Sequence, residues 1–265
     1  NVSVGGTTSL TTGAVTVSAG AGNVTFTGTV NGGQALTVNS SGLSSFVGAV
    51  GGTAALASLT TDATGTTSVG NVTTTGAQTY GDNVTLAGST LTTTNANVSV
   101  GGTTSLTTGA VTVSTGAGNV TFTGAVDGGQ ALTVNSSGAT TFSAQSGGTT
   151  PLTSVTTDAA GTLVLNGMNT TGSQTYNETT AVSLAGTFST NNSAFSIDAP
   201  ATLTGNTTIN AGTGNISFTS SVNGGSALTA NSSSNTSFGG QIGNGTALTT
   251  LTTDAGGSTS LGNVT

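Results

Sequence analysis

The charged side chains of this sequence are seven carboxylates, and no Lys, Arg, His or Cys accompanies them. Two carboxylates can cleave a glycosidic bond when they lie roughly 5–10 Å apart. Asp62, Asp158 and Asp254 are spaced 96 residues apart. With five coils between neighbours, as argued below, about 24 Å would separate them. Each stands in a Thr-Thr-Asp-Ala segment with Gly soon after, which is typical of a turn-capping Asp. We therefore expect these three residues to be structural and not catalytic.

The other acids vary between copies of the repeat. Asp82 and Glu178 are equivalent positions, and Asp198 stands where earlier copies have Gly. A further position alternates between amide and acid: Asn31, Asp127 and Asn223. Such exchange predicts exposed corners and loops. No catalytic site is expected, and the chain is not expected to be an enzyme.

Composition also argues against cofactors and several partners. The chain offers no thiolate or imidazole for a transition metal, and its isolated acids lack EF-hand spacing or the Gly/Asp nonapeptides of calcium-binding β-rolls. With no Lys or Arg to neutralise phosphates, nucleic acid is not an expected partner. No apolar run approaches the roughly 20 residues of a spanning helix, so no membrane insertion is expected. Neither a metal nor a cofactor is predicted.

A tandem repeat of 96 residues dominates the sequence. Residues 97–138 repeat residues 1–42 with three changes. A third, more diverged copy begins near residue 194 and runs to residue 265. The predicted divisions are therefore 1–96, 97–193 and 194–265, the last one incomplete, joined in one continuous rod.

A shorter echo inside the repeat indicates the fold. Residues 24–38 and 44–58 align at an offset of 20, which places Phe26 over Phe46. Units of this length are typical of a parallel β-solenoid, in which each unit forms one coil. A string of immunoglobulin-like sandwiches also suits a 96-residue period, but such domains rarely repeat internally at 20 residues. We predict an all-β, right-handed parallel β-helix with about 19–20 residues per coil and five coils per repeat.

Alternation along the strands assigns the inner and outer faces. In Asn-Val-Thr-Phe-Thr-Gly, Val24 and Phe26 point one way while Thr25 and Thr27 point the other. The apolar set is expected to form interior ladders, and the hydroxyl set the outer surface. The predicted aromatic ladder positions are Phe26, Phe46, Phe122, Phe142, Phe218 and Phe238. Tyr80 and Tyr176 are instead expected at corners with exposed hydroxyls.

The lack of charge fits this stacking. Each residue of a solenoid lies above its counterpart in the next coil, so a charged column would place like charges at strand spacing. Columns of Thr, Ser and Asn avoid that repulsion, and Asn can also bond along the stack. We therefore expect no column of acids.

Segments such as Asn-Val-Thr-Phe-Thr-Gly-Thr-Val-Asn-Gly-Gly-Gln-Ala-Leu-Thr-Val, from residue 23, resemble the repeats of very large bacterial exoproteins. These are the filamentous-haemagglutinin-like and related β-strand-repeat adhesins. The resemblance covers essentially the whole chain and implies a β-helical shaft at the bacterial cell surface or outside the cell. It also implies that any host or surface receptor is bound by regions other than this one.

Three functions remain open at this stage. The chain is expected to be the non-catalytic shaft of a fibrous adhesin, stacked against flanking repeats of the same polypeptide. The alternative is a self-assembling extracellular filament or sheath subunit, as in a biofilm matrix, whose partner is a second copy stacked end to end. A minor alternative is ice binding, which needs regular Thr-x-Thr positions; Thr25-Phe26-Thr27 has them, but Ser45-Phe46-Val47 does not.

Overall fold

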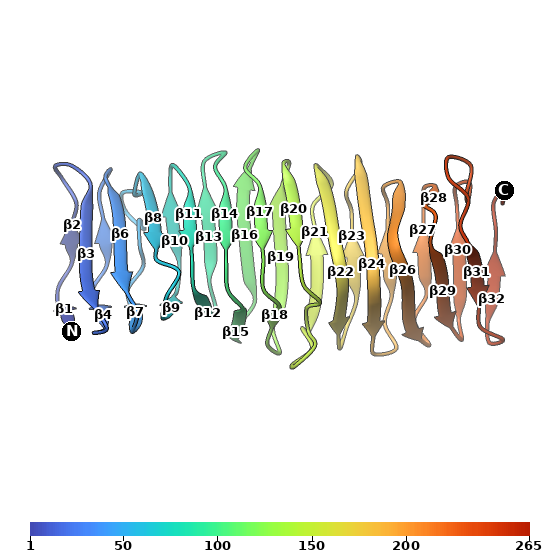
Figure 1. The fold of residues 1–265 in the computed structure, drawn as a ribbon, viewed down its shortest axis with the longest axis horizontal. Helices are drawn as coiled ribbons and strands as arrows, with labels where there is room; N and C mark the ends of the chain where they lie inside the picture. Colours follow the sequence, from blue (N-terminus) through green and yellow to red (C-terminus); the bar gives the residue numbers. More distant parts are fainter. The chain divides into compact units, whose positions relative to one another are not determined.

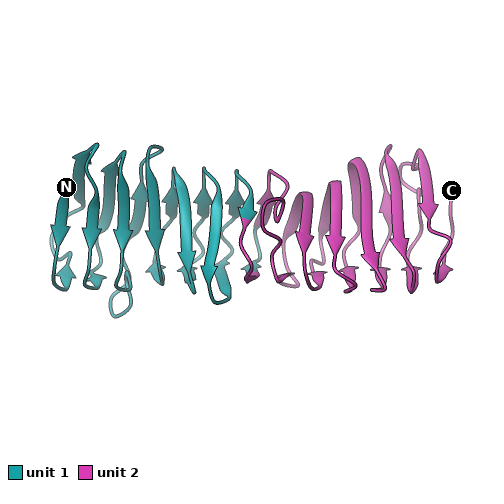
Figure 2. Cartoon of the chain, turned by 90° about the horizontal axis from the view of Figure 1, so that it is seen from below, with its two compact units in different colours: residues 1–126, 134–138 teal, residues 127–133, 139–265 magenta.

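The computed structural model describes residues 1–265, which form β-strands joined by turns and contain no helix, hence none able to cross a membrane (Figure 1). The chain divides into two compact units (Figure 2). Unit 1 comprises residues 1–126 and 134–138, and unit 2 comprises residues 127–133 and 139–265. The expected all-β parallel solenoid is confirmed in each. Its right-handedness stays a prediction that rests on the general preference of parallel crossovers.

The strands of unit 1 are short. They are β1 (Val2–Val4), β2 (Thr8–Ser9), β3 (Val15–Gly20), β4 (Val24–Phe26), β5 (Val30–Asn31), β6 (Ala35–Ser40), β7 (Leu43–Phe46), β8 (Ser58–Thr61), β9 (Thr66–Val69), β10 (Val72–Thr74), β11 (Gln78–Tyr80), β12 (Asn83–Ala87), β13 (Thr90–Thr93), β14 (Val98–Val100), β15 (Thr104–Thr108), β16 (Val111–Gly116) and β17 (Val120–Phe122). The division between the units falls within β18 (Val126–Asp127) and β19 (Ala131–Ser136).

Three parallel sheets surround the interior of unit 1. The first runs β1-β4-β7-β9-β12-β15, and the third runs β3-β6-β8-β11-β14-β17. The second begins with the β2–β5 pair, continues through single bridges at Val30, Val50 and Val72, and ends in β10-β13-β16. The chain visits the three sheets in turn, so three strands make one coil.

The number of coils per repeat differs from the expected five. The segment Val-Ser-Val recurs after 96 residues, yet β1 belongs to the first sheet and its copy β14 to the third. Four coil steps lead from β1 to β12, and β14 lies two sheets further on. One repeat therefore spans four and two-thirds coils. Coil length also varies: partners in neighbouring coils are 17 residues apart at Thr67↔Val84 and 23 apart at Ser44↔Thr67.

Unit 2 contains β20 (Ala139–Phe142), β21 (Ser154–Thr157), β22 (Thr162–Thr170), β23 (Gln174–Tyr176), β24 (Ala181–Thr190), β25 (Phe195–Ile197), β26 (Ala201–Gly212), β27 (Ile216–Phe218), β28 (Val222–Asn223), β29 (Ala227–Ser232), β30 (Asn235–Phe238), β31 (Thr250–Thr253) and β32 (Ser258–Ser260). One parallel sheet runs β21-β23-β25-β27-β30-β32, and another runs β20-β22-β24-β26-β29-β31. Two of its long strands contain glycines with left-handed backbone, Gly167 (φ 90°) and Gly186 (φ 89°), where the register of pairing shifts.

The interior is filled by the inward side chains of the alternating strands. The rings of Phe26 and Phe46 stack with centroids 5.2 Å apart, and those of Phe218 and Phe238 do the same. Phe122 and Phe142 are fully buried. The Phe positions do not form long columns, because Val69 follows Phe46 in the next coil. Unit 2 adds a ring cluster that the sequence analysis missed, in which Phe195 contacts Phe188, Tyr176 and Phe218.

The outward positions form continuous hydroxyl columns. Each member pairs in register with the next coil and bears Ser or Thr. The columns are Ser3, Thr25, Ser45, Ser68, Thr85 and Ser105 on the first sheet of unit 1; Thr16, Thr37, Thr60, Thr79, Ser99 and Thr121 on its third sheet; and Thr156, Thr175, Ser196, Ser217, Ser237 and Ser260 in unit 2.

Candidate functional site

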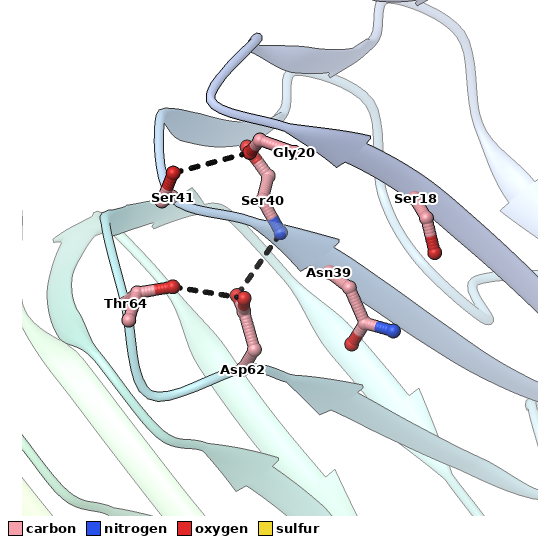
Figure 3. A pocket seen from close by; sticks show the side chains of 7 residues that line it. All are labelled: Ser18, Gly20, Asn39, Ser40, Ser41, Asp62 and Thr64. Atoms are coloured by element: carbon pink, nitrogen blue, oxygen red, sulfur yellow. Dashed lines mark hydrogen bonds between the residues drawn. The ribbon is translucent and has the colours of Figure 1, made fainter.

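Asp62 borders the main surface depression, which lies in unit 1 and has a volume of about 270 Å³. Ser18, Gly20, Asn39, Ser40, Ser41 and Thr64 line the rest of it (Figure 3). The Asp62 carboxylate accepts hydrogen bonds from the backbone N–H of Ser40, 3.1 Å away in the preceding coil, and from the Thr64 hydroxyl at 3.0 Å. Asp62 therefore ties its own turn together and fastens that turn to the coil before it.

The two later copies of this Asp lack one of those donors. Ala160 and Gly256 stand where Asp62 has Thr64 two residues on. Asp158 and Asp254 are half-buried, and the structure shows no hydrogen bond to either carboxylate. The local turn-closing contact is thus particular to Asp62.

Asp82 is buried, which corrects the expectation of an exposed corner. It follows β11 and is 4% exposed. The hydroxyl of Thr61 donates to Oδ1 at 3.2 Å, and that of Thr67 donates to Oδ2 at 2.9 Å. Burial raises the pKa of Asp82, and the two hydroxyl bonds oppose that rise, while repulsion from Asp62 adds to it. The carboxylate is buried because hydroxyls from two other strands are in place to meet it.

Glu178, the equivalent residue in unit 2, is also buried and not exposed as expected. It is 1% exposed, and its Oε2 has no hydrogen-bond partner. Leu163 replaces the donor found at Thr67. Thr157, the counterpart of Thr61, lies close enough to lower the pKa somewhat, but its hydroxyl forms no hydrogen bond of normal geometry. Burial, followed by repulsion from Asp158 and Asp198, raises the pKa of Glu178 to about 7.

The acids stack on one another, which is a second correction. Asp158, Glu178 and Asp198 are 20 residues apart and follow β21, β23 and β25, three strands paired side by side. Asp62 and Asp82 are likewise close enough to repel. The expectation of no acid column fails because the central acid of the three can remain protonated, so a column need not be fully charged.

Tyr80 and Tyr176 are fully buried, contrary to the expectation of exposed hydroxyls. The Tyr80 hydroxyl donates to Oε1 of buried Gln78 at 3.1 Å, and Tyr176 donates to Gln174 at 3.2 Å. The Gln78 amide nitrogen lies 2.8 Å from the carbonyl of Thr92. The sequence analysis missed both glutamines. The Gln-Thr-Tyr spacing was the available signal, since residues i and i+2 of a strand share a face.

The remaining acids bond to the next coil. Oδ1 of Asp127 accepts from the backbone N–H of Thr149 at 3.0 Å, and Asn31 does the same with Thr53. Only a carbonyl-type oxygen is used, so Asn and Asp serve equally at this position, which is half-buried. Asp198 is exposed and accepts a hydrogen bond from Thr219.

The chemistry available at these corners is hydrogen bonding and proton binding. No three acidic side chains come together in a group that could hold a metal ion. Of the one acid pair near the depression, Asp62 is already bonded to two donors and Asp82 is enclosed by hydroxyls. Both carboxylates therefore hold the coils together at the corner.

Comparison of the chain with protein-family models, curated proteins and solved structures finds no match. The argument for function therefore rests on the geometry described above.

Proposed function

We propose that this chain is a non-catalytic structural shaft of a fibrous bacterial exoprotein, displayed on the cell surface or released outside the cell. The observation that carries the proposal is the set of unbroken hydroxyl columns on the outward faces of both units. Their members are paired in register from coil to coil. The outer surface is therefore as repetitive as the interior, as expected of a spacer whose length is its function.

The interior supports the same role. Stacked Phe pairs, inward Val and Leu positions and buried Gln-Tyr pairs all join one coil to the next. In a solenoid, stability is close to a sum of coil stabilities and nearest-neighbour contacts, so the structure can be extended by adding repeats. The adhesin-type assignment and the surface location rest on the resemblance of the repeat segments to giant exoproteins.

Electron microscopy and fibre diffraction of the native material test this proposal. We expect thin, unbranched fibres of uniform width and a strong reflection near 4.8 Å along the fibre axis. Globular beads joined by linkers, or a sheet spacing across the fibre axis and not along it, would refute the shaft.

The second candidate is a filament subunit that stacks end to end with other copies. It is favoured by the unpaired outer edge of β1, since an open strand edge is a template for another strand. The backbone N–H of Val2 bonds to Asn23, and alternation in a parallel ladder directs the N–H of Ser3 the other way.

A single substitution separates the two candidates. Ser3→Pro removes the outward N–H and spares the bond of Val2, and Ser3→Ala is the matched control. If subunits stack through this edge, the proline variant should lengthen the lag before fibres form several-fold, while the alanine variant assembles normally. Equal behaviour of the two variants, or no assembly of the unaltered chain, supports the covalently continuous shaft.

A further inference from the structure

Glu178 lies at the centre of a stack of three acids in unit 2. Asp158 comes from the coil before it and Asp198 from the coil after it, each on a neighbouring strand of the same sheet. The nearest titratable group on its own coil is the buried phenol of Tyr176, whose pKa burial raises well above the ordinary value. The chain contains no Lys, Arg or His, so no cationic side chain faces the stack from any element.

The corner around Glu178 is built to hold the neutral acid and not the ionised one. Its Oε2 is buried without a hydrogen-bond donor. Unit 1 contains the alternative arrangement, in which Asp82 receives the hydroxyls of both Thr61 and Thr67. A buried carboxylate without such donors is costly when ionised, and two acidic neighbours increase that cost.

We propose that Glu178 acts as a proton-operated latch, which closes the corner between β23 and β24 when the carboxyl is protonated and opens it when the carboxyl ionises. Opening would let water reach the carboxylate at the price of local bonds such as those from Asp198 N–H to the Tyr176 carbonyl and from Val182 N–H to the Pro200 carbonyl. The shaft would then be locally looser in alkaline surroundings and tightest in mildly acidic ones.

The sign and size of the effect follow from proton linkage. Burial and the two Asp neighbours raise the pKa of Glu178 from 4.5 to about 7, so the closed form binds more protons than the open form between these values. The stabilisation of the closed form is complete below about pH 4.5 and is lost as pH rises through about 7. Across that range the equilibrium constant for opening rises by roughly two orders of magnitude.

A thiol probe measures the opening directly, because the chain has no Cys of its own. Ala199→Cys places a thiol beside Asp198 at a site that is 2% exposed, and Ala230→Cys places a control thiol at a fully buried site in β29. The readout is the ratio of their reaction rates with a dithiodipyridine reagent at pH 5.5 and pH 8.5. Taking the ratio removes the intrinsic pH dependence of thiol reactivity.

We expect the ratio to rise at least tenfold between pH 5.5 and pH 8.5. Glu178→Gln should abolish the rise, and Leu163→Thr, which restores the missing donor, should reduce it. Asp82→Asn should leave it unchanged, because that acid belongs to unit 1. Circular dichroism at pH 5.5 verifies that each variant is folded. A ratio that stays flat in the parent, or that rises equally with Gln at residue 178, overturns the latch.

Discussion

The buried Gln78–Tyr80 pair allows a quantitative test of how much polar groups stabilise the solenoid interior. Both side chains are fully buried, and the Tyr80 hydroxyl donates to the Gln78 amide oxygen at 3.1 Å. The Gln78 amide nitrogen also donates to the Thr92 carbonyl at 2.8 Å, which ties two neighbouring coils together. Burial raises the pKa of Tyr80 far above its usual range, so the phenol remains a donor at every practical pH.

The magnitudes follow from which partners each substitution leaves unpaired. Tyr80→Phe leaves the Gln78 oxygen without its donor and should lower the free energy of unfolding by about 1–3 kcal/mol. Gln78→Met keeps the volume but leaves the Tyr80 hydroxyl unpaired and loses the bond to Thr92, so about 2–4 kcal/mol is expected. In the double variant neither group remains to be unpaired. Its loss should fall short of the sum of the single losses by about 1–2 kcal/mol.

Guanidinium unfolding followed by circular dichroism measures all four corners of this cycle. The equivalent pair Gln174–Tyr176 provides an internal replicate, because its hydroxyl-to-amide distance is 3.2 Å. Additive losses, or a Gln78→Met variant as stable as the parent, would refute the inference that these buried bonds stabilise the fold.

Three further perturbations test the stacking geometry. Gly28→Ala would place a Cβ 2.4 Å from the Gly6 carbonyl oxygen in the preceding coil, so a loss of about 1–3 kcal/mol is expected by thermal or guanidinium unfolding. Phe46→Ala removes the stack on Phe26 and should cost about 3–5 kcal/mol. Asn23→Ala removes an acceptor 2.9 Å from the backbone N–H of Leu43 and should cost about 1 kcal/mol, seen as faster amide exchange at that corner.

A matched glycine distinguishes steric overlap from a general intolerance of glycine substitution. A Cβ at Gly33 meets no atom within 4 Å, and its backbone is not left-handed. Gly33→Ala should therefore be neutral within about 0.5 kcal/mol, or slightly stabilising through the unfolded chain. Equal losses at Gly28 and Gly33 would contradict the coil-to-coil contact that we infer.

The sequence was sufficient to predict the solenoid because two of its signals are local. The 20-residue echo aligned Phe26 with Phe46, and these residues are register partners. Alternation then separated inner Val24 from outer Thr25. The coil count was less accurate, because corner lengths vary and the three sheets share the same alternating pattern. Nothing local to a strand tells which sheet it joins.

The acid corners needed information that only the register supplies. Thr61 and Thr67 reach Asp82 from 21 and 15 residues away, so neither donor is evident beside it in the sequence. Exchange of Asp82 for Glu178 was interpreted as exposure, although both positions are enclosed. One signal was available: the spacing of Asp158, Glu178 and Asp198 equals the coil echo. That equality predicts a stack, and a stack with no cation nearby predicts a retained proton.

The fractional number of coils per repeat determines how this protein presents itself to its surroundings. Within unit 1 the segment Asn-Val-Thr-Phe occurs on the first sheet at β4 and again on the third sheet at β17. A chain that continues this pattern turns two-thirds of the way around with every repeat and regains its starting side after three. A partner approaching from one direction would therefore meet the same chemical group only at every third repeat, while repeats taken together offer each group to every side. Identical sequence copies then act as three differently directed ones, which spaces equivalent attachment points widely along any one side.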